Sequence, residues 1–109
     1  MAVTHWRIQR ITALLLVPLV IIFLNYMLNI GQTAYTEILK DIASTTGFIM
    51  VFISTFILYI HSSMGIEVII EDYIHNIIWQ KFIINVSKIL HLIMFISTLL
   101  IMFIIRGSY

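Results

Sequence analysis

Three long runs of apolar residues constrain the fold of this chain more than any other feature. Residues 11–36 and 42–66 carry no charge, and 82–105 is interrupted only by Lys88. A helix that crosses a bilayer needs about 20 largely apolar residues, so each run is long enough to cross one. The sequence therefore predicts an all-α integral membrane protein with three transmembrane helices. We place them at about 9–30, 46–70 and 82–105.

The composition agrees with this class and excludes several others. Hydrophobic residues make up 61% of the 109 residues and charged residues 10%, whereas soluble domains average about a quarter charged. The net charge of +1, without a basic cluster, argues against nucleic-acid binding. The lack of cysteine excludes disulfides, thiolate metal sites and iron–sulfur ligation by this chain. No domain boundary or internal repeat divides it, so 1–109 is predicted to be one membrane-anchor domain, in which 31–45 forms a short outer loop that could include a helical turn.

The basic residues predict an orientation, because they favour the inner side of a membrane. With the N-terminus inside, four of the six basic residues lie on the inner face and two on the outer face. The inner four are Arg7, Arg10, Lys81 and Lys88, and the outer two are Lys40 and Arg106. The chain is therefore predicted to have its N-terminus inside and its C-terminus outside, with the 67–81 loop on the inner face.

The second apolar run contains His61, about nine residues from its inner end, roughly 14 Å deep on a straight helix. Ionisable residues at such depth are costly and usually functional. Three interpretations are open: a neutral histidine bonded to a neighbouring helix, a proton relay, or an axial ligand of haem iron. Gly65, one turn further on the same face, would either admit a flat macrocycle or allow close helix packing.

A second histidine leaves the ligand set open. His91 lies about as deep in the third helix as His61 does in the second, so antiparallel neighbours could present both rings at one level. A ligand from another subunit is equally allowed. Zinc is the weaker interpretation, because no histidine, cysteine or carboxylate lies three or four residues from His61.

Residues near the inner boundary supply further candidates. The phenol of Tyr73 can hydrogen-bond a quinone carbonyl, and the adjacent Asp72 can orient an arginine or a water that supplies protons. His75 is a second candidate for proton handling. Arg10 either anchors the first helix at the interface together with Trp6, or binds a buried anion such as a cofactor carboxylate.

These residues resemble a known family. His61, Gly65, Asp72 and Tyr73 form the pattern His-x3-Gly-x6-Asp-Tyr, and Arg10-Ile-Thr-Ala opens the first helix. The pattern resembles the small cytochrome b-type membrane anchor subunit of succinate dehydrogenase, respiratory complex II. The resemblance implies that His61 is one axial ligand of haem b, with the other ligand from a partner anchor chain. It also implies that Tyr73 hydrogen-bonds ubiquinone, that Asp72 supports this pocket, and that Arg10 lies near the haem propionates.

The resemblance implies a non-catalytic subunit of a larger enzyme. A flavoprotein subunit would oxidise succinate, and an iron–sulfur subunit would pass electrons to ubiquinone between this chain and a large cytochrome b anchor. The complex would serve the tricarboxylic acid cycle and respiratory electron transport in a bacterial or mitochondrial inner membrane. Two alternatives stay open: another b-type haem electron carrier using His61 and His91, and a cofactor-free structural subunit of a membrane complex.

Overall fold

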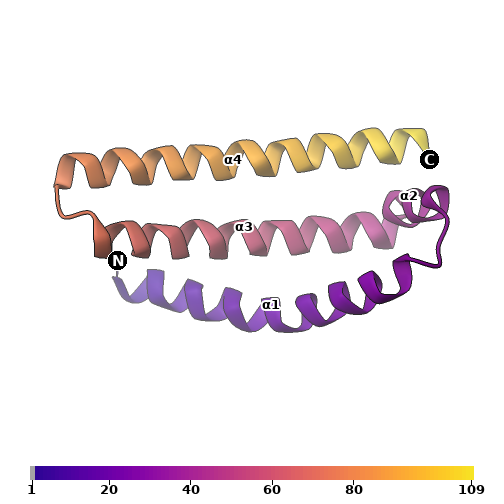
Figure 1. Ribbon diagram of the computed structural model, residues 1–109, viewed down its shortest axis with the longest axis horizontal. Helices are drawn as coiled ribbons and strands as arrows, with labels where there is room; N and C mark the ends of the chain where they lie inside the picture. Colours follow the sequence, from indigo (N-terminus) through magenta and orange to yellow (C-terminus); the bar gives the residue numbers. More distant parts are fainter. Residues whose placement is uncertain (1) are drawn as a thin grey trace.

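Four α-helices make up nearly all of the computed structural model, which describes residues 2–109. They are α1 (Ala2–Ile30), α2 (Tyr35–Ala43), α3 (Thr45–Tyr73) and α4 (Ile77–Ser108). The three long helices lie side by side, and α3 lies between α1 and α4 and contacts both (Figure 1). The short α2 covers the end of the bundle near the C-terminus. The described part of the chain contains no β-strand.

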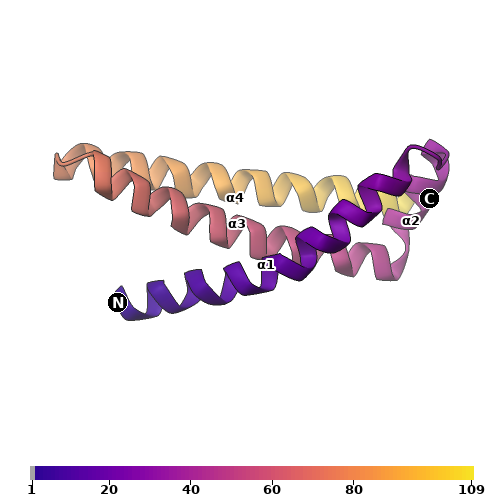
Figure 2. The same cartoon turned by 60° about the horizontal axis from the view of Figure 1, so that its bottom comes forward.

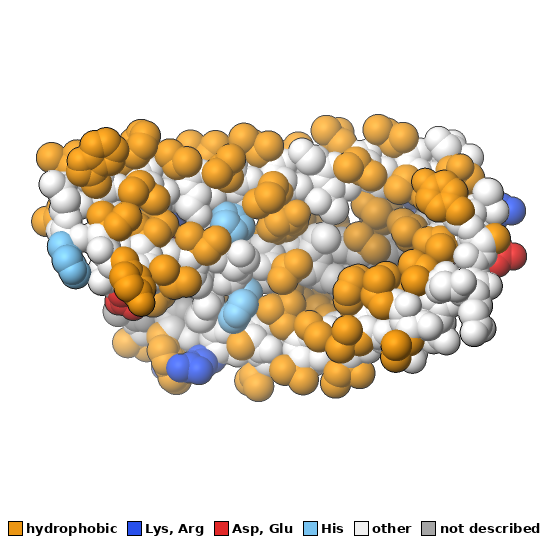
Figure 3. Space-filling view, in the orientation of Figure 1, with side chains coloured by type: hydrophobic (Ala, Val, Ile, Leu, Met, Phe, Trp, Pro, Cys, Tyr) orange, Lys and Arg blue, Asp and Glu red, His pale blue; other side chains and the backbone are white. Residues whose placement is uncertain are grey.

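The prediction of an all-α membrane protein with three spanning helices is confirmed. Each long helix is long and apolar enough to cross a bilayer. Large apolar side chains cover the outside of the bundle (Figure 3), and Leu14 and Leu28 are examples that are mostly exposed. Helices that are apolar all round belong in a non-aqueous environment. Lipid or partner helices therefore provide the contacts that these side chains lack within the chain.

The helices are longer than the apolar runs. The helix α3 continues through Tyr73, so the acidic residues expected in an inner loop lie on its last turns, and the connection to α4 is only 74–76. Asn76 ends this connection by capping α4, because its side-chain oxygen accepts hydrogen bonds from Ile78 N at 3.0 Å and Trp79 N at 3.3 Å. The residue that sets the start of α4 thus lies outside the apolar runs.

A helix also occupies most of the segment that was expected to be an outer loop. Ser44 separates α2 from α3 and caps α3 by accepting a hydrogen bond from Gly47 N at 3.0 Å. A Cβ at Gly47 would collide with the carbonyl oxygen of Asp41, so glycine permits the close approach of α2 to α3. Arg106 of α4 reaches Thr45 Oγ1 at 3.3 Å and ties the C-terminal end to this junction.

The course of the chain puts the two termini at opposite ends of the bundle. The N-terminus lies at the same end as the α3–α4 connection, and the C-terminus lies beside α2 (Figure 1). The helix α1 crosses α3 at an angle (Figure 2) and is bowed along its length. Pro18 lies inside α1 and removes one backbone hydrogen bond, which accounts for curvature at its middle.

Candidate functional site

A seam of polar side chains runs along the interface of α1 and α3. On α1 these residues recur every three to four positions and so share one face. Because α3 runs antiparallel to α1, each meets a residue progressively earlier in α3. The facing pairs are His5 with Glu67, Gln9 with Gly65, and Thr12 with His61. The predicted candidate His61 therefore belongs to an interhelical polar seam inside the apolar part of the bundle.

The innermost pair of this seam joins Thr12 to His61. The Thr12 hydroxyl lies 3.0 Å from His61 Nδ1, and Thr12 is 7% exposed. The same hydroxyl lies 2.8 Å from the carbonyl oxygen of Ile8 and 3.1 Å from that of Gln9. His61 itself is half-buried, and its Nε2 has no hydrogen-bond partner within residues 2–109 and is not enclosed by them. One ring nitrogen is thus held by α1 and the other is free.

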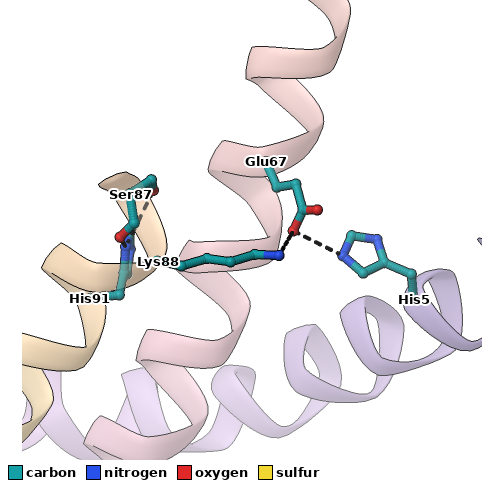
Figure 4. Close-up of polar contacts among 5 residues, drawn as sticks. All are labelled: His5, Glu67, Ser87, Lys88 and His91. Carbon is teal, nitrogen blue, oxygen red and sulfur yellow. Dashed lines mark hydrogen bonds and ion pairs between the residues drawn. The ribbon is translucent and has the colours of Figure 1, made fainter. Parts of the chain in front are cut away.

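His91 has a different environment, because both of its ring nitrogens are used within the chain. Its Nδ1 lies 2.7 Å from the carbonyl oxygen of Ser87, which can only accept, so Nδ1 carries the proton (Figure 4). Its Nε2 then accepts a hydrogen bond from the Ser62 hydroxyl at 3.1 Å. The residue is 7% exposed. His91 therefore fits a histidine that stabilises the contact between α3 and α4.

The intrachain histidine pair allowed by the sequence does not form in this arrangement. His61 contacts α1, while the next residue, Ser62, contacts His91 on α4. Successive residues on a helix point about 100° apart, so the two contacts lie on different faces of α3. Among residues 2–109, no three histidine, cysteine or acidic side chains are grouped so as to hold a metal ion.

Gly65 lies against α1. A Cβ at this position would lie 3.4 Å from Gln9 Nε2, which is ordinary contact with the end of a flexible side chain. A small side chain would fit on this side as well, so the contact with Gln9 does not decide between the two interpretations of Gly65. Gln9 Oε1 is enclosed and has no hydrogen-bond partner within residues 2–109.

An ionic cluster that the sequence analysis missed joins all three long helices near the α3–α4 connection. Glu67 Oε2 lies 3.5 Å from Lys88 Nζ and 3.6 Å from His5 Nε2 (Figure 4). The sequence had indicated for Lys88 only a part in the charge bias that predicts the orientation. The available signal was that Glu67 directly follows one apolar run and Lys88 interrupts the next, because charged residues in a membrane span usually pair with one another.

The other predicted candidates lie at the same end of the bundle and are exposed. Tyr73 is 81% exposed at the end of α3, next to the exposed Asp72. The side chains of Tyr73, Asp72 and His75 make no hydrogen bond or ion pair with residues 2–109. The Arg10 guanidinium lies over the ring of Trp6, 5.5 Å from its centroid, and is also exposed. The chain by itself therefore does not bring these residues to His61.

Comparisons with known proteins agree with the family that the sequence resembles. A family model described as succinate dehydrogenase/fumarate reductase transmembrane subunit matches residues 1–105. The succinate dehydrogenase membrane anchor subunit of Reclinomonas americana is 36% identical to this chain over 75 residues. That match covers 66% of this chain and 62% of the relative, so less than two thirds of the relative's length is represented. No solved structure matches the chain.

Proposed function

Since this chain belongs to the succinate dehydrogenase/fumarate reductase transmembrane subunit family, we propose that it anchors a succinate:ubiquinone oxidoreductase in its membrane. In this proposal it performs no succinate chemistry and is a non-catalytic subunit. It supplies half of a haem b site and part of the site where ubiquinone is reduced. The free Nε2 of His61, inside an apolar span, is the observation that carries the proposal.

His61 fits one axial ligand of a b-type haem. Neutral imidazole is a common ligand of haem iron, and an iron-bound histidine usually donates its other ring N–H to a nearby acceptor. His61 meets both requirements, because Nδ1 has a hydroxyl partner and Nε2 has none. When bound, the haem would supply a one-electron redox centre within the membrane. His91 does not fit this role, since both of its nitrogens are already hydrogen-bonded.

The second axial ligand would come from a large cytochrome b anchor subunit. Of the two histidines in the middle of the spans, only His61 has a ring nitrogen without a hydrogen-bond partner within residues 2–109, so a bis-histidine site needs a histidine from another chain. The mostly exposed apolar faces of α1 and α4 are available for a partner of this kind. Two anchor chains would then enclose the haem between them.

We propose that Arg10 neutralises a propionate of that haem. It precedes Thr12, the contact of His61, by two residues, which is about 3 Å along the helix axis and about 200° around it, so its long side chain would have to reach around α1. Its guanidinium is exposed and stacked on Trp6, and it makes no ion pair within residues 2–109. Arginine binds carboxylates through two parallel hydrogen bonds, so we propose that Arg10 fixes the edge of the haem that faces the inner side.

Tyr73 and Asp72 would form this chain's part of the ubiquinone site. Tyr73 lies twelve residues beyond His61 on one continuous helix, about 18 Å along its axis. In the proposed mechanism its phenol donates a hydrogen bond to a quinone carbonyl and holds it while negative charge develops there. Asp72 orients the groups that deliver protons. An iron–sulfur subunit docked on this inner face, with the flavoprotein subunit beyond it, would supply the electrons.

The proposal is tested by Tyr73→Phe in the assembled complex. Loss of the phenolic donor should lower succinate:quinone reductase activity by about 10- to 100-fold, because one hydrogen bond to the reacting carbonyl is lost. Succinate oxidation with an artificial dye should stay near the wild-type rate. The matched control is Tyr35→Phe, at a tyrosine that is 72% exposed at the opposite end of the bundle. Equal loss of both activities in Tyr73→Phe would refute this role.

A further inference from the structure

We propose that Thr12 is a positioning residue for His61. Its hydroxyl accepts the Nδ1–H hydrogen bond of His61 and so presents an unprotonated Nε2 to haem iron. This inference rests on the proposed function, and it adds a residue on a second helix that sets the tautomer and the ring orientation of the ligand.

The first step concerns the single proton of the Thr12 hydroxyl. Of the three atoms near Thr12 Oγ1, the carbonyl oxygens of Ile8 and Gln9, at 2.8 and 3.1 Å, can only accept a hydrogen bond. Threonine inside a helix commonly donates to the carbonyl four residues earlier, and the Ile8 contact is the shortest of the three. With its proton used in this way, Oγ1 offers only lone pairs to His61 Nδ1 at 3.0 Å.

The second step concerns which ring nitrogen of His61 carries the proton. If Oγ1 accepts, Nδ1 must carry the proton, and a neutral imidazole has only one such proton. The lone pair of the ring then lies on Nε2. This atom has no hydrogen-bond partner within residues 2–109 and is not enclosed by them, so a ligand from outside the chain can reach it. The opposite tautomer would leave an N–H at Nε2 without a partner in an apolar span, which is unfavourable.

The third step is that this hydrogen bond is rigid. Thr12 is 7% exposed, and its hydroxyl is fixed by its own helix as well as by His61. One turn further along α3, toward the α3–α4 connection, Gly65 lies against Gln9 of α1. The ring plane of His61 is therefore set by the packing of α1 on α3. Hydrogen bonding at Nδ1 also raises the basicity of the ligand, which favours the oxidised state of a bound iron.

Substitutions at Thr12 in the purified complex test this inference. Thr12→Val keeps the β-branched shape and removes the acceptor, so the haem midpoint potential should shift to higher values and the low-spin electron paramagnetic resonance signal should change. Thr12→Ser keeps the hydroxyl and should match wild type. Thr12→Cys, with a weaker acceptor, should fall between them and serves if Thr12→Val does not assemble. Ser87→Ala, beside His91, is the matched control and should leave both signals unchanged.

The outcomes separate this inference from the proposed function. Wild-type potential and resonance signal in Thr12→Val, or in Thr12→Cys where only that variant assembles, would overturn the role of Thr12 and leave haem ligation by His61 standing. A wild-type complex without a haem spectrum, or a His61→Ala complex with an unchanged one, would overturn the haem site itself. A shift in Ser87→Ala as large as that in Thr12→Val would show a general packing effect and would also overturn the positioning role.

Discussion

Replacing Lys88 by methionine should leave the Glu67 carboxylate without its nearest cation. In the structure Lys88 Nζ lies 3.5 Å from Glu67 Oε2, and the Glu67 side chain is only 19% exposed. His5 Nε2, at 3.6 Å, can offset the charge of Glu67 only when the imidazole is protonated. The carboxylate would therefore stay partly desolvated with one fewer partner, and the contact between α3 and α4 should weaken.

The distance between Lys88 and Glu67 sets the expected loss of stability. Two unit charges 3.5 Å apart attract each other by about 5 kcal/mol at an effective dielectric constant of about 20. The Lys88 side chain is 53% exposed, so solvent screening and side-chain entropy reduce the net value to about 1 kcal/mol. We expect a loss of about 2 kcal/mol for Lys88→Met, because it strands the more buried partner, and about 1 kcal/mol for Glu67→Gln. The double variant should lose about 1 kcal/mol less than the sum of the two.

A double-mutant cycle measures this coupling. The free energy of unfolding can be obtained from SDS titration in mixed micelles, followed through the fluorescence of Trp6 on α1 and Trp79 on α4. Lys40→Met is the matched control, because Lys40 lies on α2 and has no ion-pair partner within residues 2–109. Additive losses for Lys88→Met and Glu67→Gln, or a loss in Lys40→Met equal to that in Lys88→Met, would refute the pairing.

Two further predictions concern the ligand and the orientation. Haem content of the complex should fall below detection in His61→Ala and stay near wild type in His91→Ala. Of these two histidines, only His61 has a ring nitrogen without a hydrogen-bond partner within residues 2–109. Pyridine haemochrome spectra measure the haem content, and the reverse result would contradict the assignment. In this cysteine-free chain, Tyr35→Cys should react with an impermeant thiol reagent in intact cells and Asn76→Cys should not. The two residues lie at opposite ends of the bundle, at the start of α2 and in the α3–α4 connection. The opposite labelling would reverse the proposed topology.

The spans could be predicted because they depend on a local property. Each apolar run exceeds the length that a bilayer core requires, so the number of crossing helices follows from hydropathy alone. The helix ends could not be predicted in this way. The helix α3 has 29 residues and is about 44 Å long, well beyond the roughly 30 Å of hydrocarbon. Its ends follow from caps such as Ser44, which hydropathy does not report.

In the candidate site, too, the local properties of residues could be predicted and their contacts could not. The depth of His61 and the exposure of Tyr73 beyond the end of its apolar run follow from their distance to the nearest charged residues, and the resemblance supplied roles for them. The hydrogen-bond partners of His61 and His91 could not be predicted, because two histidines at similar depth look alike in a sequence. The ion pair of Glu67 with Lys88 was missed for the same reason, since each residue alone resembles an ordinary boundary charge.

By itself, the sequence determined the class of this protein, its three membrane crossings and the depth of its polar residues, since all of these depend on the local cost of placing a side chain in hydrocarbon. Only the tertiary structure decided which of the two deep histidines has a free nitrogen. That choice depends on how each helix is rotated about its axis and on the register between helices: α3 turns His61 toward Thr12 of α1, and Ser62 toward His91 of α4. Rotation and register are properties of the packed bundle, and no single helix specifies them.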